Sequence, residues 1–177
     1  MRLRWIHFLI ALALAAGADL GTKLWARHTL PVVPSGCAVP EDFIAHRCHG
    51  ERVPIIDGFW DWDLAFNPSS AFGLVRSTET ARWLLSAAAF LALIVIAVIV
   101  HKARHDRRLY FWGLGLIAGG ALGNLVDRVQ FGVVTDFVLW YVGEHKWPIF
   151  NVADAVLFVG VGLILLDGWV GAKKPAA

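Results

Sequence analysis

The chain has 177 residues, of which 58% are hydrophobic and only 17% are charged, against roughly 25% charged in an ordinary soluble domain. Its mean hydropathy of +0.60, together with 9 Trp and 11 Phe, excludes both a soluble domain and a disordered chain. The formal net charge of +2 is too small to indicate a nucleic-acid partner. The composition predicts a membrane protein with room for one domain.

Four stretches are apolar enough to cross a hydrocarbon core, which takes about 20 residues of helix. They are residues 6–27, 83–100, 109–127 and 148–166. The fourth contains only one charged residue, Asp154, whereas the first carries Asp19, Lys23 and Arg27. We predict an all-α integral membrane protein with four transmembrane helices.

The basic residues indicate how these helices are oriented, because cytoplasmic loops carry an excess of Lys and Arg near the membrane. Half of the 16 Lys and Arg residues lie in three short segments, 1–5, 101–108 and 171–177. The two other connections, 29–81 and 129–146, are poor in basic residues. We therefore predict that both termini are cytoplasmic and that these two connections face outward.

The N-terminus has an alternative interpretation as a cleavable signal peptide. A basic start, an apolar run and the sequence Ala16-Gly17-Ala18 form the pattern of such a peptide. Apolar character resumes after Asp19, however, and cleavage would leave three spans. It would also place the C-terminus on the side that its basic residues disfavour.

The outward connections contain two candidate strands. Aromatic and acidic residues nearly alternate from Phe59 to Phe66, between Gly58 and Pro68, which predicts a short strand. A second candidate, residues 133–141, follows the third span. It could pair with the first strand or lie flat on the membrane.

Two cysteines lie in the first outward connection. Oxidation is possible outside the cytoplasm, so Cys37 and Cys48 could form a local disulfide; two free thiols are the alternative. His46 and His49 stand beside Cys48, but the set lacks a recognised zinc-ligand spacing. We expect a solvated loop there, and neither a metal nor a cofactor in the protein.

Ionisable side chains inside the spans carry the functional signal. Each costs roughly 2.5 to 3.5 kcal/mol at the centre of a helix and so needs a partner or a role. They are Asp19, Lys23, Asp127, Arg128 and Asp154. Asp19 and Lys23 are four residues apart on one helix face, and this pair could be purely structural.

Asp127 and Asp154 are predicted in the outer third of the membrane. At 1.5 Å per residue, Asp127 lies about 27 Å from the inner end of its span and Asp154 about 9 Å below the outer end of the next. Each follows an asparagine by three positions, Asn124 and Asn151, so amide and acid share a helix face. Because the two helices run antiparallel, each acid could meet the amide of the opposite helix.

Two carboxylates in a low-dielectric site tend to share a proton and to titrate as a pair. One could then take a proton from water while the other donates to a scissile carbonyl, as in aspartic proteases. Alternatively, both acids are salt-bridged to Arg128 or Lys23 and only hold the bundle together. A small proton-coupled transporter, in which intramembrane acids carry protons, is the rival function, and a purely structural membrane subunit is the third.

At these residues the sequence resembles the lipoprotein signal peptidase family, also called signal peptidase II. Four segments carry the resemblance. They are residues 19–23, similar to D-x-x-T-K; Asn67 with 71–73, similar to N-x-G-x-A-F; 119–128, matching G-G-A-x-G-N-x-x-D-R; and 150–154, matching F-N-x-A-D.

The resemblance implies that Asp127 and Asp154 are the catalytic dyad. It implies a second set of residues that shape the site and bind the substrate: Asp19, Lys23, Asn67, Asn124, Arg128 and Asn151. The pair Asp136-Phe137 resembles the D-F that follows the family's third helix, and we interpret it as structural. Ser69 stands where the family usually has Gly, and residues 35–53 resemble an insertion without an assigned role.

The resemblance also implies a four-helix bundle with a small outward-facing β-sheet cradle, forming a single membrane-embedded peptidase domain over residues 1–177. Its substrates would be prolipoproteins cleaved just before a diacylglyceryl-modified cysteine. We accordingly expect a monomeric aspartic peptidase of the bacterial inner membrane, in contact with membrane lipids, with its active site near the outer face.

Overall fold

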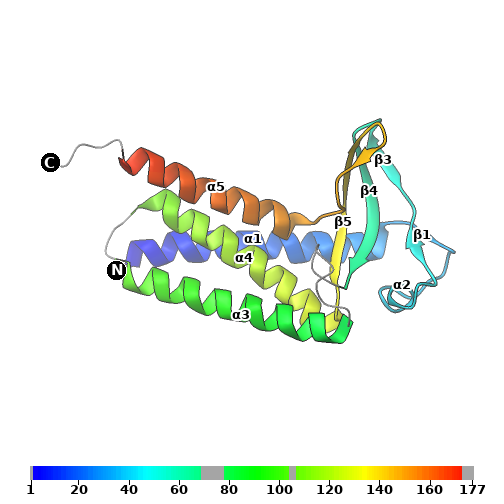
Figure 1. Ribbon diagram of the computed structural model, residues 1–177, viewed down its shortest axis with the longest axis horizontal. Coiled ribbons are helices and arrows are strands. Elements are labelled where there is room, and N and C mark those ends of the chain that lie inside the picture. Colours follow the sequence, from blue (N-terminus) through cyan, green and yellow to red (C-terminus); the bar gives the residue numbers. More distant parts are fainter. Residues whose placement is uncertain (1, 69–77, 104–106, 173–177) are drawn as a thin grey trace. The chain divides into compact units, whose positions relative to one another are not determined.

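The computed structural model describes residues 2–68, 78–103 and 107–172 (Figure 1). The long helices are α1 (Arg2–Thr29), α3 (Thr78–Lys102), α4 (Arg108–Phe131) and α5 (Val152–Ala172), and α2 (Glu41–Ile44) is a short helix. The strands are β1 (Val32–Val33), β2 (His49–Gly50), β3 (Val53–Ile56), β4 (Trp60–Asn67), β5 (Val134–Val142) and β6 (His145–Lys146).

The chain divides into two compact units. The helical unit comprises Met1–Asp19, Ala87–Leu125 and Val152–Ala177. The sheet unit comprises Leu20–Ser86 and Val126–Asn151. Helices α1, α3 and α4 each contribute residues to both units.

Within the described residues, four helices are long and apolar enough to cross a membrane, in agreement with the number of spans predicted from hydropathy. They cover Leu3–Thr29, Glu79–Lys102, Arg108–Phe131 and Val152–Val170. Continuous apolar sequence of this length can satisfy its backbone hydrogen bonds in lipid only as helix, unless it belongs to a closed barrel. Together with small antiparallel sheets, these helices form the architecture expected of a membrane enzyme.

The fourth span begins later than the predicted residue 148. Phe150 donates its backbone N–H to the carbonyl of Val138 at 3.0 Å and accepts one from the Val138 N–H at 2.9 Å. This pairing commits Phe150 to the edge of β5, so α5 starts at Val152. Asp154 therefore lies in the first turn of α5, not about 9 Å below the helix end, and Asn151 precedes the helix.

Close helix packing in the helical unit depends on glycines of α4. A Cβ at Gly119 would lie 2.5 Å from the Ala15 Cβ of α1, and one at Gly120 would lie 2.6 Å from the Ala153 carbonyl oxygen of α5. Only a residue without a side chain permits these approaches. The apolar core around them is Phe8, Ile96, Val100, Phe111, Leu114 and Ala118.

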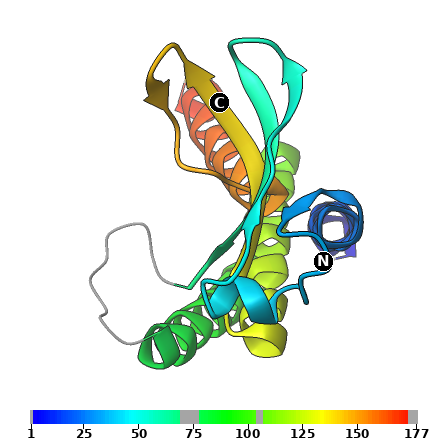
Figure 2. The same ribbon diagram turned by 90° about the vertical axis from the view of Figure 1, so that its right-hand side faces the viewer.

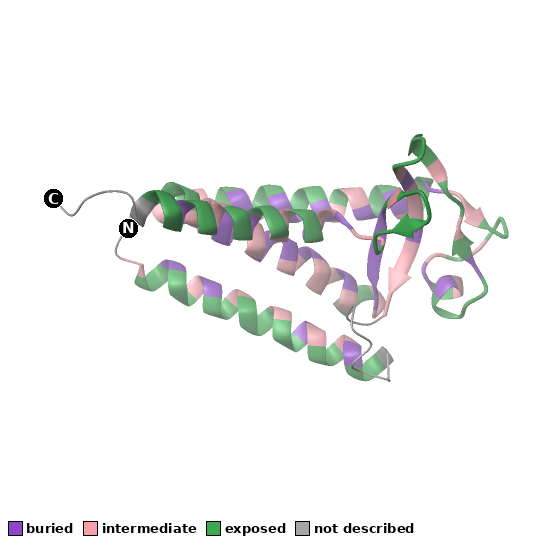
Figure 3. Cartoon of the chain, turned by 45° about the horizontal axis from the view of Figure 1, so that its top comes forward, coloured by how far each residue is buried: buried purple, intermediate pink, exposed green. Residues whose placement is uncertain are grey.

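The sheet unit is built on a four-stranded antiparallel sheet in the order β3-β4-β5-β6 (Figure 2). Its central strands pair Trp62 with Val138 and Asn67 with Val134. The alternation from Phe59 to Phe66 thus forms the predicted strand, and the segment 133–141 pairs with it. The first six residues of β5 are buried (Figure 3), and they include two polar residues, Thr135 and Asp136.

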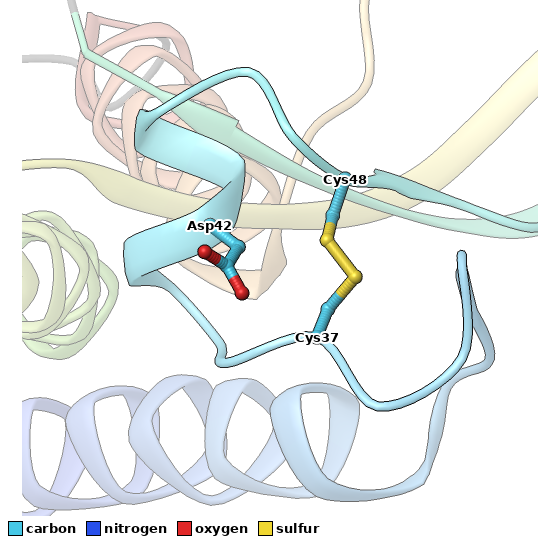
Figure 4. Close-up of side chains that lie close together, drawn as sticks. All are labelled: Cys37, Asp42 and Cys48. Atoms are coloured by element: carbon cyan, nitrogen blue, oxygen red, sulfur yellow. A yellow bond between two sulfur atoms is a disulfide. The ribbon is translucent and has the colours of Figure 1, made fainter.

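A disulfide closes the loop that carries α2. Cys37 and Cys48 are bonded, with their Cα atoms 6.4 Å apart (Figure 4). Of the two sequence-based alternatives, the structure therefore has the disulfide. Phe43 of α2 packs edge-on against Phe66 of β4, with ring centroids 5.0 Å apart, so the closed loop rests on the end of β4.

The carboxylate of Asp42 lies beside the two sulfur atoms (Figure 4), and the three potential ligand atoms are within 4.8 Å of one another. Metal binding by cysteine requires thiolates, whereas these sulfurs are bonded to each other. Asp42 accepts a hydrogen bond from the Ala38 N–H at 2.9 Å and lies 3.6 Å from Arg47. These contacts make Asp42 part of the loop structure.

Candidate active site

The predicted site residues are divided between the two units. The helical unit holds Asp19, Asn124 and Asp154, and the sheet unit holds Lys23, Asn67, Asp127, Arg128 and Asn151. Residues 69–77, which include the rest of the Asn67 motif and Ser69, lie outside the described residues.

Asp19 is fully buried and contacts the start of α5. Its Oδ1 accepts a hydrogen bond from the backbone N–H of Ala153 at 2.8 Å. The first N–H groups of a helix have no partner within the helix, and a negative charge there also interacts favourably with the helix dipole. Asp19 therefore stabilises the turn that carries Asp154.

A glycine of α4 leaves room for this acid. A Cβ built at Gly123 would collide with the carboxylate of Asp19. This accounts for the Gly-Asn pair in the α4 motif: Gly123 leaves room for Asp19, and the next residue, Asn124, faces α5.

Asn124 contacts Asp154 across the two helices. The Asn124 Nδ2 donates to the Asp154 Oδ1 at 3.4 Å, which confirms that this acid meets the amide of the opposite helix. Asp154 is exposed, whereas Asp19 is not. Of the two, Asp154 is the carboxyl that water and a ligand can reach.

Asp127 is fully buried among hydrogen-bond donors in the sheet unit. Its Oδ1 accepts from the Arg27 Nη1 at 3.0 Å. Its Oδ2 accepts from the Thr135 N–H at 2.8 Å and lies 3.7 Å from the Lys23 Nζ. Both oxygens of this carboxylate are therefore engaged, and two cations balance its charge.

Arg27 is a site residue that sequence reasoning missed. Arg27 lies in the predicted first span without an assigned role. The sequence offered only Lys23 or Arg128 as a salt-bridge partner for Asp127. Lys23 is a partner, and Arg27 is the closer one. Its spacing could have revealed it, because Arg27 follows Lys23 by four residues and thus shares the helix face of Lys23.

Asn151 has partners other than the expected Asp127. It is fully buried, and its Nδ2 donates to the Thr135 carbonyl oxygen at 3.2 Å and to the Asp136 Oδ1 at 2.7 Å. The prediction of Asp127 assumed that Asn151 lies within the helix. The Val138–Phe150 pairing instead keeps Asn151 beside β5.

Asp136 therefore joins the set of candidate functional residues, although its sequence motif was interpreted as structural. It is 4% exposed and lies opposite Ala65 in the sheet. A buried carboxylate needs hydrogen-bond donors, and the Asn151 amide is one. The signal in the sequence is a lone acid within a largely apolar strand.

The remaining site residues flank this network. Asn67 is the last residue of β4 and pairs with Val134 of β5. Arg128 lies in the last turn of α4, next to Asp127. Both are partly buried.

A further intramembrane acid lies beyond the predicted end of the fourth span. Asp167 is 8% exposed and forms an ion pair with Arg107. Both residues belong to the helical unit. Asp167 lies near the end of α5 and Arg107 directly precedes α4, so this pair ties the end of α5 to the start of α4.

Comparisons with known proteins agree with the family resemblance and with the fold. The family model described as signal peptidase (SPase) II matches residues 10–170. The lipoprotein signal peptidase of Xanthomonas campestris pv. campestris (strain 8004) is 33% identical over 171 residues, covering 94% of this chain and 90% of its own. That of Oleidesulfovibrio alaskensis is 34% identical over 168 residues, covering 94% and 96%.

A solved structure described as a bacterial membrane enzyme, determined by the in meso method at 2.3 Å resolution, has the same fold. Its TM-score with this chain is 0.72 at 22% identity, and the match covers 96% of this chain and 93% of the other. The fold and the sequence matches define a membrane-embedded protease. The chain belongs to the signal peptidase II family. It is accordingly a hydrolase that cleaves signal peptides in lipoprotein processing, with prolipoproteins as its substrates.

Proposed function

We propose that the protein is an intramembrane aspartic endopeptidase. It removes the signal peptide from a prolipoprotein just before the diacylglyceryl-modified cysteine. Family membership over residues 10–170 and four membrane-capable helices support this function. The observation that carries the aspartic mechanism is Asp154, an exposed carboxyl that accepts a hydrogen bond from Asn124, where both residues lie in the segments that carry the family resemblance.

The chemistry needs two carboxyl groups, one ionised and one protonated. The ionised group takes a proton from water, and the water oxygen bonds to the scissile carbonyl carbon while the protonated group donates to the carbonyl oxygen. Collapse of this tetrahedral species breaks the C–N bond, and the leaving amine takes a proton from the dyad. Asp154 supplies one carboxyl.

The second carboxyl is Asp127 in the sequence-based prediction, and Asp136 is a second candidate. Arg27 and Lys23 balance the charge of Asp127, whose two oxygens are both engaged. Asp127 is also fully buried, so its oxygens are occupied by donors of the chain itself.

The contacts of Asp136 support its candidacy. Asn151 donates to it at 2.7 Å, in the same way that Asn124 donates to Asp154. Each of these two acids thus has a family-motif asparagine beside it. In this version of the dyad, Asp127 organises the site and does not exchange protons with the substrate.

The location follows from the same proposal. The protein is a single peptidase domain in the bacterial inner membrane, monomeric and surrounded by lipid, with both termini in the cytoplasm. The scissile bond is then cleaved near the outer face, while the signal helix and the diacylglyceryl group of the substrate stay in the bilayer. Asp19, Lys23, Asn67 and Arg128 shape the site.

Three separate substitutions test the dyad: Asp154→Asn, Asp127→Asn and Asp136→Asn. Each variant is assayed in detergent with a metal chelator, on a diacylglyceryl-modified prolipoprotein and on its unmodified form. Asp57→Asn is the matched control, because Asp57 is an exposed acid in a turn of the sheet unit.

We expect wild type and Asp57→Asn to cleave only the modified substrate, and Asp154→Asn to be inactive while folded. The partner of Asp154 is the acid whose folded Asn variant has no detectable activity, whereas the other Asn variant should keep a measurable fraction of the wild-type kcat, as expected of a residue that only organises the site. Normal activity of Asp154→Asn would refute the aspartic mechanism. Proton flux through liposomes without peptidase activity would instead support the transporter.

A further inference from the structure

Arg27 lies four residues beyond the D-x-x-T-K motif and carries no role in the resemblance. Its Nη1 donates to the Asp127 Oδ1 at 3.0 Å and to the Thr135 Oγ1 at 2.8 Å. The guanidinium carbon lies 4.6 Å from the ring centroid of Phe131, and the side chain is only 11% exposed. Three contacts, to Asp127, Thr135 and Phe131, therefore hold this side chain.

Two ordinary explanations for an arginine at this place are insufficient. An arginine near the end of a transmembrane helix often extends its charged group toward the lipid headgroups. A basic residue in the last turn of a helix also interacts favourably with the helix dipole. Both explanations are satisfied by an exposed side chain, whereas the Arg27 guanidinium points inward to two acceptors.

The contacts of Arg27 close a three-membered network. Arg27 joins Asp127 of α4 to the hydroxyl of Thr135 in β5, and the N–H of Thr135 returns to the other oxygen of Asp127. The side chain and the peptide nitrogen of Thr135 are thus both fixed. All three residues belong to the sheet unit.

The network continues to the candidate catalytic residues through the next peptide. The carbonyl oxygen of Thr135 and the carboxylate of its neighbour Asp136 both accept hydrogen bonds from Asn151. If the Thr135 peptide rotates, the Asn151 amide loses one acceptor and the Asp136 side chain changes its direction. The orientation of Asp136 therefore depends on the network that Arg27 closes.

We propose that Arg27 is a positioning residue of the peptidase: through Asp127 and Thr135 it holds the first residues of β5, and with them Asp136 and Asn151, in the orientation that catalysis needs. This inference rests on the proposed function. It also assigns a purpose to the buried charge of Asp127 that does not require Asp127 itself to transfer protons.

The test compares Arg27→Gln, Arg27→Lys and Thr135→Val. Thr135→Val removes the hydroxyl acceptor and keeps the backbone N–H. Arg52→Gln is the matched control, because Arg52 forms an ion pair with Asp63 at 3.3 Å in the same unit with its side chain 44% exposed. For each variant, kcat and KM on the diacylglyceryl-modified prolipoprotein are measured together with the unfolding temperature in detergent.

We expect Arg27→Gln to lower kcat about tenfold to a hundredfold, the range produced by small misplacements of catalytic groups, with KM unchanged within about twofold. Arg27→Lys should recover part of kcat, because lysine keeps the charge but not the planar group that packs over Phe131. Thr135→Val should lower kcat as well. Combining it with Arg27→Gln should cost less than the product of the single effects, because both act through one network.

A normal kcat in both Arg27→Gln and Thr135→Val, with only a lower unfolding temperature, would overturn the inference and leave a structural role. If Arg27→Gln does not fold, Thr135→Val and Arg27→Lys decide, and normal kcat in both overturns it. Failure of the proposed function is distinguishable, since wild type would then not cleave the substrate or Asp154→Asn would remain active. That outcome refutes both proposals.

Discussion

The carboxylate of Asp19 accepts a hydrogen bond from the backbone N–H of Ala153, 2.8 Å away and 134 residues later in the chain. Ala153 immediately precedes Asp154, so a motif residue of α1 determines how the first turn of α5 presents that acid. Within the helical unit, this bond accounts for a charged residue that is entirely removed from solvent.

Replacement of Asp19 by alanine should destabilise the protein and reduce its activity. The variant leaves the Ala153 N–H without its acceptor, and such buried losses cost about 1–3 kcal/mol. Asp19→Asn keeps an oxygen acceptor but loses the negative charge that interacts favourably with the helix N-terminus. Its loss of stability and of activity should therefore be smaller than that of Asp19→Ala. Unfolding in detergent and cleavage rates measure both effects, and equal stability of Asp19→Ala and wild type would contradict this role.

Gly123→Ala should be disruptive, because its Cβ would collide with the Asp19 carboxylate. Overpacking of this kind costs about 1–3 kcal/mol, and here it also displaces the acid that holds α5. The matched control is Gly162→Ala in α5, whose Cβ meets nothing within 4 Å. The control should be neutral or slightly stabilising, because alanine is the better helix former. Equal unfolding temperatures for the two variants would argue against close packing at Gly123.

The Cys37–Cys48 disulfide should stabilise the sheet unit. A bond between cysteines 11 residues apart lowers the conformational entropy of the unfolded chain, and this stabilises the folded state by about 2–3 kcal/mol. Reductant should therefore lower the unfolding temperature of wild type and leave that of the Cys37→Ser/Cys48→Ser double variant unchanged. A reductant effect of the same size in the double variant would show that some other bond or process is responsible.

Stability should depend on pH through Asp63 of β4. Burial raises the pKa of Asp63 above the ordinary 3.8, although the hydrogen bond and charge of Arg52 oppose the shift. The folded state then binds this proton more tightly than the unfolded state, so the stabilisation by Asp63 is greatest in acid. It is lost as the pH rises from about the unfolded pKa through the raised folded pKa.

Asp63→Asn tests this dependence because its side chain does not titrate. Its stability relative to wild type should increase as the pH rises above 3.8, and unfolding curves over a pH series measure the difference. In Arg52→Gln the pKa of Asp63 should rise further, since a favourable charge is removed, and the loss of stability should extend to higher pH. A constant difference between Asp63→Asn and wild type across the series would refute the shift.

Much of the fold could be predicted because its signals are local. A transmembrane helix satisfies its own backbone hydrogen bonds, so apolar length alone identified the four spans. The alternation in 59–66 identified β4 in the same way. The Asn124–Asp154 contact was predictable too, because it requires only that two adjacent helices run antiparallel.

The remaining contacts depend on segments far apart in the chain, and only the tertiary structure decided them. Sequence alone could not show that Phe150 pairs with Val138, and this pairing moves the start of α5 and turns Asn151 toward Asp136. Nor could it show that Arg27 is a partner of Asp127. Residue types and spacing determined which charges enter the membrane, whereas the partners of those charges were set by which backbone and side-chain donors the folded chain brings within hydrogen-bonding distance.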